Sequence, residues 1–206
     1  MADYKDYGFH ESGPAHTFQY LQQPILDMLA DNSDRRILDL GCGNGYLVNY
    51  LLSKGYDAFG TDASAEGVAI AKQTNANRFY LQDLSTGKLP TELQDKQFDT
   101  VISTEVIEHL YDPAGFINFC KRCLAPGGEI IISTPYHGYL KNLLLSLFNK
   151  WDTHLNPMWH GGHIKVWSRN TLSKALTEAG FTVTGFTGCG RIPYFWKSMI
   201  IKAKLD

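Results

Sequence analysis

Glycine occupies every second position at the end of the segment Asp39 to Gly45, which reads Asp-Leu-Gly-Cys-Gly-Asn-Gly. Glycine has no Cβ atom, so such a run lets the backbone approach a ligand closely where side chains would block it. A dinucleotide-binding turn, G-x-G-x-x-G, would need glycine or alanine at position 46 or 48, and Tyr46 and Val48 stand there instead. The segment therefore predicts a small-molecule site of another kind, or a purely structural turn with incidental glycines.

Two further acidic residues stand at the ends of later apolar segments. Asp62 comes seventeen residues after Gly45, and Asp83 follows residues 79–81. A carboxylate at the end of a second strand can accept both hydroxyls of a ribose in a bidentate way. Either residue alone would be an ordinary loop carboxylate. Together with the glycine turn, at the ends of three successive predicted strands, they predict a ligand site at the carboxyl edge of a parallel sheet.

A third group of chemically active side chains is Glu105, Glu108 and His109. On a helical turn, positions i, i+3 and i+4 share one face, so we expect these side chains to converge on one point that could hold a divalent cation. Without a metal, His109 could act as general base, because its ordinary pKa of about 6.5 lies close to neutral pH. A neighbouring glutamate would orient the ring and raise that pKa. The imidazole could also be only hydrogen-bonded.

Residues 135–167 are rich in aromatic side chains and histidines but follow no clean period. This composition is typical of an insertion or lid beside a sheet, and it suits a pocket for a planar or sugar-like small molecule. The aromatic side chains could equally fill a core of the lid itself. We take His163 as a second candidate catalytic residue beside His109. Residues 1–34 are expected to form an N-terminal cap, either closing over the ligand or packed on the sheet as a surface helix.

Seven apolar segments are predicted as the strands that position these residues. They are Arg36–Leu40, Tyr56–Thr61, Phe79–Leu81, Phe98–Ser103, Glu129–Ser133, Phe181–Phe186 and Ser198–Ala203. Helical patterns fill most intervals, and three of them begin at capping residues, namely Ser64, Asp112 before Pro113, and Ser168. Strands that alternate with helices predict an α/β fold, a three-layer sandwich with a mostly parallel sheet between helices.

The pattern D-x-G-x-G-x-G resembles motif I of the class I methyltransferases, and the resemblance extends over residues 36–135. It implies S-adenosylmethionine as cofactor, with Asp39 suited to the ammonium group of that ligand, and a Rossmann-like sheet of seven strands whose last strand is antiparallel. By the same resemblance, the expected cofactor-binding residues are Asp39, Gly41, Cys42, Gly43, Gly45, Asp62, Ala63, Asp83, Leu84, Thr104 and Glu105.

The segment E-x-x-E-H at positions 105–109 is similar to one in the ubiquinone-biosynthesis O-methyltransferases. This resemblance implies a magnesium ion held by Glu105, Glu108 and His109, which would lower the pKa of a phenol or catechol hydroxyl. The predicted activity is methyl transfer to the hydroxyl of a small molecule, aromatic or quinol-like. The alternatives are N-methylation of a small amine or a protein, and a protein that binds S-adenosylmethionine without catalysis.

Length and composition favour one methyltransferase domain over residues 1–206, since 206 residues fit one compact domain. The net charge of −2 gives no basic footprint for nucleic acid, and no proline pair follows the fourth strand to stack an extruded base. No run of about 18 apolar residues could span a bilayer, and the first residues do not resemble a secretory signal. We therefore expect a cytoplasmic enzyme that acts on a small molecule; its oligomeric state stays open.

Overall fold

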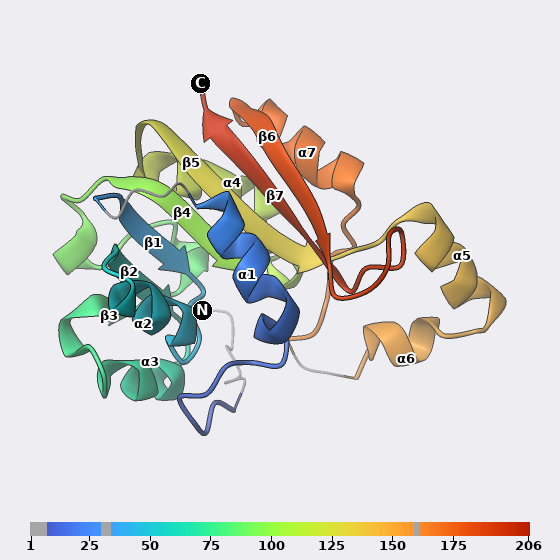
Figure 1. Ribbon diagram of the computed structural model, residues 1–206, viewed down its shortest axis with the longest axis horizontal. Helices are drawn as coiled ribbons and strands as arrows, with labels where there is room; N and C mark the ends of the chain where they lie inside the picture. Colours follow the sequence, from blue (N-terminus) through green and yellow to red (C-terminus); the bar gives the residue numbers. More distant parts are fainter. Residues whose placement is uncertain (1–7, 30–33, 159–160) are drawn as a thin grey trace.

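The computed structural model describes residues 8–29, 34–158 and 161–206. Within these residues, seven strands form one sheet in the order β3-β2-β1-β4-β5-β7-β6 (Figure 1). The strands are β1 Arg36–Leu40, β2 Asp57–Asp62, β3 Phe79–Leu81, β4 Phe98–Thr104, β5 Leu124–Pro135, β6 Phe181–Cys189 and β7 Ser198–Leu205. Strands β1 to β5 pair in parallel, and β7 is antiparallel to both β5 and β6. The predicted fold class, with its antiparallel last strand, is confirmed.

Helices cover both faces of the sheet (Figure 1). One face carries α1 Phe18–Met28, α2 Tyr46–Ser53 and α3 Ala65–Lys72, and the other carries α4 Pro113–Cys123 and α7 Arg169–Glu178. Side chains of a strand point to alternate faces, so each face has its own apolar core. In β1, Ile37 packs into the core below α1, α2 and α3, whereas Leu38 packs into the core below α4 and α7.

The predicted helix caps are present. Ser64 accepts a hydrogen bond from the backbone N–H of Gly67 at 2.8 Å, and Asp112 accepts one from that of Gly115 at 2.8 Å. Ser168 and Thr171 form a reciprocal capping box at the start of α7. Each cap satisfies an N–H group that has no partner inside its helix, and so fixes where the helix leaves the sheet.

Strand β5 is longer than its sequence pattern indicates. Residues 125–128, whose sequence Ala-Pro-Gly-Gly is typical of a turn, lie inside the strand, because Phe98 pairs with Leu124 and Thr100 pairs with Glu129. The four intervening residues form an irregularity in the ladder, where Gly127 has a φ of +71°. The strand therefore begins at Leu124 and not at Glu129, because Leu124 pairs with Phe98 of the neighbouring strand β4.

A helical insertion follows β5. It contains α5 Tyr139–Leu147 and α6 Trp151–Leu155, which project beyond one end of the molecule (Figure 1). The chain then returns to the sheet, where the backbone N–H of His137 donates to the carbonyl oxygen of Trp167 at 3.0 Å. Residues 159–160 lie outside the described part of this predicted lid. That the insertion closes over a substrate stays a prediction.

The N-terminal region contains the surface helix packed on the sheet, which was one of the two arrangements that the sequence left open; closure over a ligand stays a prediction. Helix α1 packs on the sheet through Leu21 and Ile25, and the residues before it lie against the glycine turn. Residues 1–7 and 30–33 of the predicted cap are outside the described part. Among the helices of the described residues, none has the length and apolar character needed to cross a membrane.

Replacing Gly45 by alanine should destabilise the fold more than the same change at Gly55. Both residues have positive φ, +75° and +90°, which costs alanine about 1–2 kcal/mol. A Cβ at Gly45 would also lie 2.7 Å from Phe79 and press on Ala71, whereas a Cβ at Gly55 meets nothing within 4 Å. Urea unfolding should show about 1–3 kcal/mol of additional destabilisation for Gly45→Ala. Equal destabilisation of the two variants would contradict this packing.

Candidate active site

The glycine turn lies between β1 and α2 and is held tightly by its neighbours. Gly41 and Cys42 donate their backbone N–H groups to the carbonyl oxygen of Thr61 at 2.8 and 3.0 Å. The φ angles of the three glycines are +85°, +54° and +75°, a region that other residues rarely adopt. A Cβ on Gly41 would press on Val106, and one on Gly43 would lie 2.7 Å from Phe9. Backbone conformation and close packing therefore require glycine at these positions, in addition to any role in ligand binding.

Asp62 fixes the position of this turn. At the end of β2, its Oδ2 accepts a hydrogen bond from the backbone N–H of Gly43 at 2.8 Å, and its Oδ1 accepts one from that of Ser64 at 2.7 Å. The same carboxylate thus joins the glycine turn to the start of α3. This places Asp62 at the carboxyl edge beside the turn, as the sequence predicted. Its contact with a ribose stays a prediction.

Asp39 is the buried acid of the site. It is only 1% exposed, and its Oδ1 has no hydrogen-bond partner among the described residues. Burial, together with the negative charge of Asp62, raises the pKa of Asp39 to about 8. Asp39 is thus a buried carboxyl group with one oxygen that lacks a hydrogen bond among the described residues, and it lies next to the glycine turn. A cationic ligand group such as an ammonium fits this position, because it would stabilise the carboxylate form of Asp39.

The remaining predicted cofactor residues lie at the ends of β2, β3 and β4. Asp83 is exposed, and its Oδ1 accepts from the backbone N–H of Ser85 at 2.9 Å, so it caps the short 3-10 helix η2 Leu84–Thr86. Ala63 and Leu84 are half-buried, as is Thr104 at the end of β4. The order β3-β2-β1-β4 brings these strand ends to the same edge of the sheet. That edge is where open α/β sheets bind ligands.

Two residues that were not predicted from the sequence also pack at this edge, where they join the N-terminal segment to the glycine turn. Asn44 donates its side-chain amide to the carbonyl oxygens of Glu11 and Gly13, both at 2.8 Å. Phe9 lies against Gly43 and Gly67. Both contacts join residues more than thirty positions apart, so no local pattern could have revealed them. Through them the N-terminal segment covers the glycine turn.

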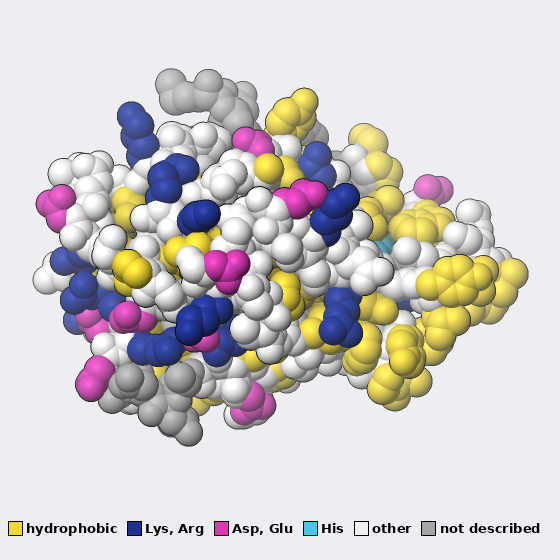
Figure 2. All heavy atoms as spheres, turned by 90° about the horizontal axis from the view of Figure 1, so that it is seen from above, with side chains coloured by type: hydrophobic (Ala, Val, Ile, Leu, Met, Phe, Trp, Pro, Cys, Tyr) yellow, Lys and Arg dark blue, Asp and Glu magenta, His cyan; other side chains and the backbone are white. Residues whose placement is uncertain are grey.

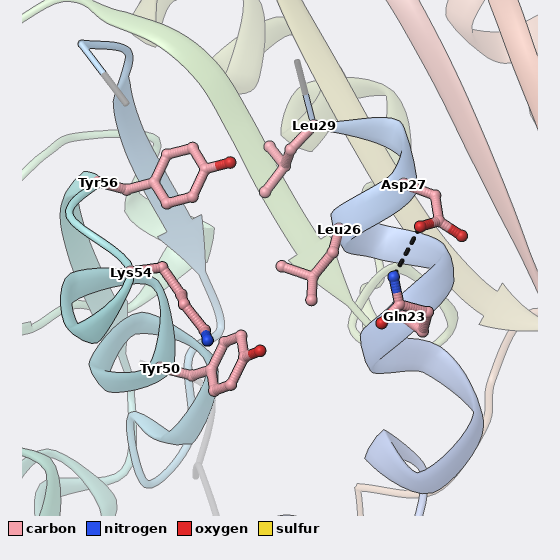
Figure 3. Close-up of a pocket in the computed structure, with 7 residues that line it drawn as sticks. All are labelled: Gln23, Leu26, Asp27, Leu29, Tyr50, Lys54 and Tyr56. Atoms are coloured by element: carbon pink, nitrogen blue, oxygen red, sulfur yellow. Dashed lines mark hydrogen bonds between the residues drawn. The ribbon is translucent and has the colours of Figure 1, made fainter. Parts of the chain in front are cut away.

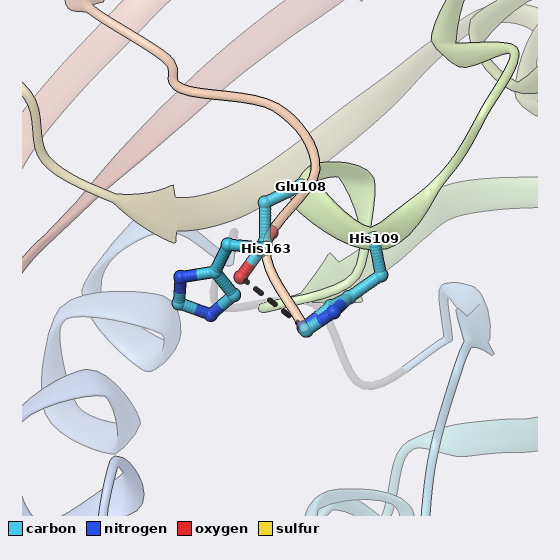
Figure 4. A group of neighbouring side chains, drawn as sticks. All are labelled: Glu108, His109 and His163. Carbon is cyan, nitrogen blue, oxygen red and sulfur yellow. Dashed lines mark ion pairs between the residues drawn. The ribbon is translucent and has the colours of Figure 1, made fainter. Parts of the chain in front are cut away.

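Figure 4 shows a second group, in which Glu108, His109 and His163 point toward one another. One possible metal-ligand atom from each of the three residues lies within 4.8 Å of the other two. Glu108 is 1% exposed; its Oε2 accepts from the hydroxyl of Thr134 at 3.0 Å, while its Oε1 lacks a hydrogen bond within the described residues. That Oε1 lies 3.9 Å from Nε2 of His109. The rings of His109 and His163 pack edge to face with centroids 5.0 Å apart.

Glu105 does not join this group. The expected helical turn over residues 105–109 is a short 3-10 helix, η4 Ile107–His109, and Glu105 precedes it with a φ of +54°. Its carboxylate accepts from the hydroxyls of Ser133 at 2.7 Å and Ser198 at 3.0 Å, which hold it between β5 and β7. The convergence predicted from the i, i+3, i+4 spacing is therefore wrong for Glu105, and His163 stands beside the other two residues instead.

His109 has a defined tautomer. Its Nδ1 lies 2.6 Å from the carbonyl oxygen of Gly161 and 3.2 Å from that of Gly162. Carbonyl oxygens only accept, so Nδ1 carries the proton and the neutral ring has its lone pair on Nε2. Burial lowers the pKa of His109, contrary to the increase expected from a glutamate neighbour. The reason is that burial and Glu105 raise the pKa of Glu108 well above its ordinary value, which disfavours the negative charge that would raise the pKa of His109.

A groove elsewhere on the molecule carries none of the predicted site residues. Figure 3 shows it between α1 and the C-terminal end of α2, away from the glycine turn at the start of α2. It measures about 510 Å³ and is lined by Gln23, Leu26, Asp27, Leu29, Tyr50, Lys54 and Tyr56. Within the groove, the side-chain amide of Gln23 donates a hydrogen bond to Oδ1 of Asp27 at 2.7 Å. The predicted site residues therefore lie at the carboxyl edge and not in this groove.

A family described as a methyltransferase domain matches residues 15–185, most of the chain. The chain belongs to this methyltransferase family. Membership confirms the predicted class of enzyme, a methyltransferase that depends on S-adenosylmethionine. Which residues hold the cofactor and what accepts the methyl group are separate questions.

Curated relatives and solved structures agree with this assignment. A ubiquinone biosynthesis O-methyltransferase of Acinetobacter baumannii (strain ACICU) is 26% identical over 86% of this chain and 77% of its own length. One of Paracidovorax citrulli is 33% identical over 60% of this chain, and the match spans only 53% of that relative.

The magnesium protoporphyrin IX methyltransferase of Synechocystis PCC 6803, solved with bound SAH, has a TM-score of 0.66 at 21% identity, over 90% of this chain and 80% of that one. A Mesorhizobium loti methyltransferase has a TM-score of 0.68 at 18% identity, over 88% and 96%. The two structures share the fold.

Binding of S-adenosylmethionine should release a proton from Asp39 near pH 7. With a pKa of about 8, the carboxyl is mostly protonated in the ligand-free protein, and a nearby ammonium group favours the carboxylate. Affinity should therefore rise between about pH 6.5 and 8.5. Calorimetric titrations in buffers of different ionisation enthalpy count the proton. Asp39→Asn should abolish the release, and an unchanged release in that variant would contradict the assignment.

The raised pKa of Asp39 also predicts how the stability of the protein depends on pH. Because this pKa is higher in the folded than in the unfolded state, protonation of Asp39 favours folding at low pH, and the contribution is lost as the pH rises through about 8. Without ligand, the wild-type free energy of unfolding should decrease from pH 6 to pH 8 relative to that of Asp39→Asn.

Proposed function

We propose that the protein transfers the methyl group of S-adenosylmethionine to a hydroxyl group of a small aromatic or quinol-like molecule. The observation that carries this proposal is the tautomer of His109: its Nδ1–H donates to the carbonyl oxygen of Gly161, so the lone pair of the neutral ring is on Nε2. A ring held in this way is suited to accept a proton from a hydroxyl group. The names of the curated relatives, ubiquinone biosynthesis O-methyltransferases, support an oxygen acceptor.

The chain's own residues have two tasks in this reaction. The sulfonium of the bound cofactor supplies an electrophilic methyl group, and transfer requires the acceptor oxygen, methyl carbon and sulfur to lie in line. The glycine turn, Asp39 and Asp62 orient the donor in this proposal. His109 takes the hydroxyl proton on Nε2 as the oxygen–methyl bond forms, so the acceptor leaves as a neutral ether.

His163 and Glu108 act as positioning residues for His109. Burial and, to a smaller extent, the nearby basic side chains of His109, His154 and Lys141 lower the pKa of His163 to about 4. Its ring is therefore neutral at pH 7 and packs against His109 without repelling it. The backbone N–H groups of Ile164 and Lys165 both donate to the carbonyl oxygen of Glu108 at 3.0 Å. These bonds tie the insertion to the site and support the proposal that residues 135–167 form the substrate lid.

A metal-assisted version of the same reaction is the second candidate. Glu108, His109 and His163 provide one oxygen and two nitrogen ligands, and the unsatisfied Oε1 of Glu108 favours a cation there. A divalent ion would lower the pKa of the acceptor hydroxyl and replace the base. Two imidazoles suit a transition metal better than the magnesium expected for Glu105, Glu108 and His109.

Substitution His109→Gln should lower turnover with a phenol or catechol acceptor by about a hundredfold or more, because general-base catalysis is lost. Its dissociation constant for S-adenosylmethionine should stay within about twofold of the wild type, since the ring lies beyond the proposed donor-binding residues. Wild-type turnover should reach a plateau by about pH 7, because the pKa of His109 is below its ordinary value.

The same assay separates the alternatives. Unchanged turnover in His109→Gln would contradict the base, and a preference for amine acceptors in both proteins would favour N-methylation. Loss of wild-type activity on chelation, restored by Mn²⁺ or Zn²⁺, would favour the metal. The absence of turnover with all acceptors despite tight cofactor binding would favour a non-catalytic binding protein.

A further inference from the structure

Helix α5 presents its apolar face outward. Leu140, Leu143, Leu144 and Leu147 follow the i, i+3, i+4, i+7 spacing that normally faces a protein core. With Tyr139 and Phe148 they are between 38% and 78% exposed, and no residue of α5 is buried. Figure 1 shows why: α5 projects from the end of β5, and no sheet or helix of the described residues covers its outer side.

The polar side of α5 faces the protein instead. Lys141 donates its Nζ to the carbonyl oxygens of Tyr136 and Lys197, at 2.7 and 3.4 Å. The amide oxygen of Asn142 lies 3.3 Å from Nδ1 of His137. Polar contacts to the body thus orient the helix so that its leucines point to solvent. This is the reverse of an ordinary surface helix.

The inner end of this arm is well packed. His137 is buried and stacks on Trp151 of α6 with centroids 6.1 Å apart and ring planes at 8°. It also meets His154 edge to face at 5.1 Å. The segment that carries the exposed leucines is therefore packed against neighbouring side chains at its inner end.

The apolar surface continues onto the loop between β6 and β7, where Ile192 and Tyr194 are 68% and 60% exposed. The Lys141 bond to Lys197 joins α5 to this loop. Figure 2 shows hydrophobic side chains gathered over this end of the molecule. We call these residues of α5 and the loop the apolar arm. Soluble proteins rarely expose so continuous an apolar surface unless it binds something.

Charge around the apolar arm selects its partner. Residues 136–167 and 190–197 contain Lys141, Lys150, Lys165, Arg191 and Lys197 against one acid, Asp152, in a chain of net charge −2. A second copy bound through the same patch would bring these cations face to face, because a twofold interface pairs identical surfaces. An anionic lipid surface offers both an apolar interior and opposite charge.

We propose that the apolar arm binds the surface of a membrane that contains anionic lipids. Apolar side chains of α5 and the loop enter the headgroup boundary while Lys150 and Arg191 contact lipid phosphates. The insertion returns from the arm to Glu108, so the bound protein holds its active site close to the lipid. This last step rests on the proposed function, because an aromatic or quinol-like acceptor partitions into lipid.

Vesicle flotation tests the proposal with the full chain. The protein should float with vesicles of phosphatidylcholine and phosphatidylglycerol and much less with phosphatidylcholine alone, and about 0.5 M salt should weaken the binding. The double variant Leu147→Glu/Phe148→Glu should lose at least about tenfold in partitioning, because it removes apolar area and adds repulsive charge. The matched control is Leu81→Glu, on the opposite edge strand β3, where the side chain is 58% exposed; it should bind as the wild type.

Calorimetry with S-adenosylmethionine shows that the variants remain folded, and light scattering reports their oligomeric state. Flotation of wild type and Leu81→Glu but not of the double variant supports the proposal, even if no hydroxyl acceptor is ever methylated. Absence of flotation overturns it, as does equal binding to neutral and anionic vesicles. A dimer that the double variant dissociates, without vesicle binding, overturns it in favour of a second copy.

Discussion

The hydrogen bond from the backbone N–H of Gly43 to the carboxylate of Asp62 is the contact on which the site depends. It joins the turn after β1 to the end of β2, and the bonds of Gly41 and Cys42 to Thr61 reinforce it. Because the backbone of the turn is held at positive φ, its N–H groups and the buried Asp39 keep fixed positions beside the strand ends. The N-terminal segment can cover the turn through Asn44 and Phe9 only while this geometry holds.

The second group of side chains depends on the first through the sheet. Strand β4 pairs with β1 and β5, and its end leads into η4, where Glu108 and His109 lie. The returning insertion brings His163 and the carbonyl oxygen of Gly161 to this point. The residues proposed to bind the donor and those proposed to activate the acceptor thus lie at one edge of one sheet, although they come from segments more than a hundred residues apart.

Elements with strong local signals were predictable from the sequence. Strands β1 and β3 were predicted with the bounds that the structure has, and Ser64, Asp112 and Ser168 cap helices as expected. The position of Glu105 was not predicted by helical spacing, because it precedes the short helix η4. Its carboxylate accepts hydrogen bonds from Ser133 and Ser198 instead of facing Glu108 and His109 from a common helical turn.

What depended on distant contacts could not be predicted. His163 meets His109 across 54 positions, and a leucine stripe looks the same in sequence whether it faces a core or solvent. The contacts of Lys141 and Asn142 with the body of the protein, and the exposure of the leucines, show which way α5 faces.

In our proposal, the carboxyl edge around Asp39 and Asp62 holds S-adenosylmethionine. Calorimetric titration of the wild type, Asp62→Ala and Asp57→Ala with S-adenosylmethionine and with NAD can decide whether it does. Asp57 lies in the same strand at its other end, bound to Arg36 and Arg78, and serves as the matched control. We expect micromolar binding of S-adenosylmethionine alone, weakened more than about tenfold by Asp62→Ala and unaltered by Asp57→Ala. Clear binding of NAD, or an unchanged dissociation constant for S-adenosylmethionine in Asp62→Ala, would show that this edge does not hold the cofactor as proposed.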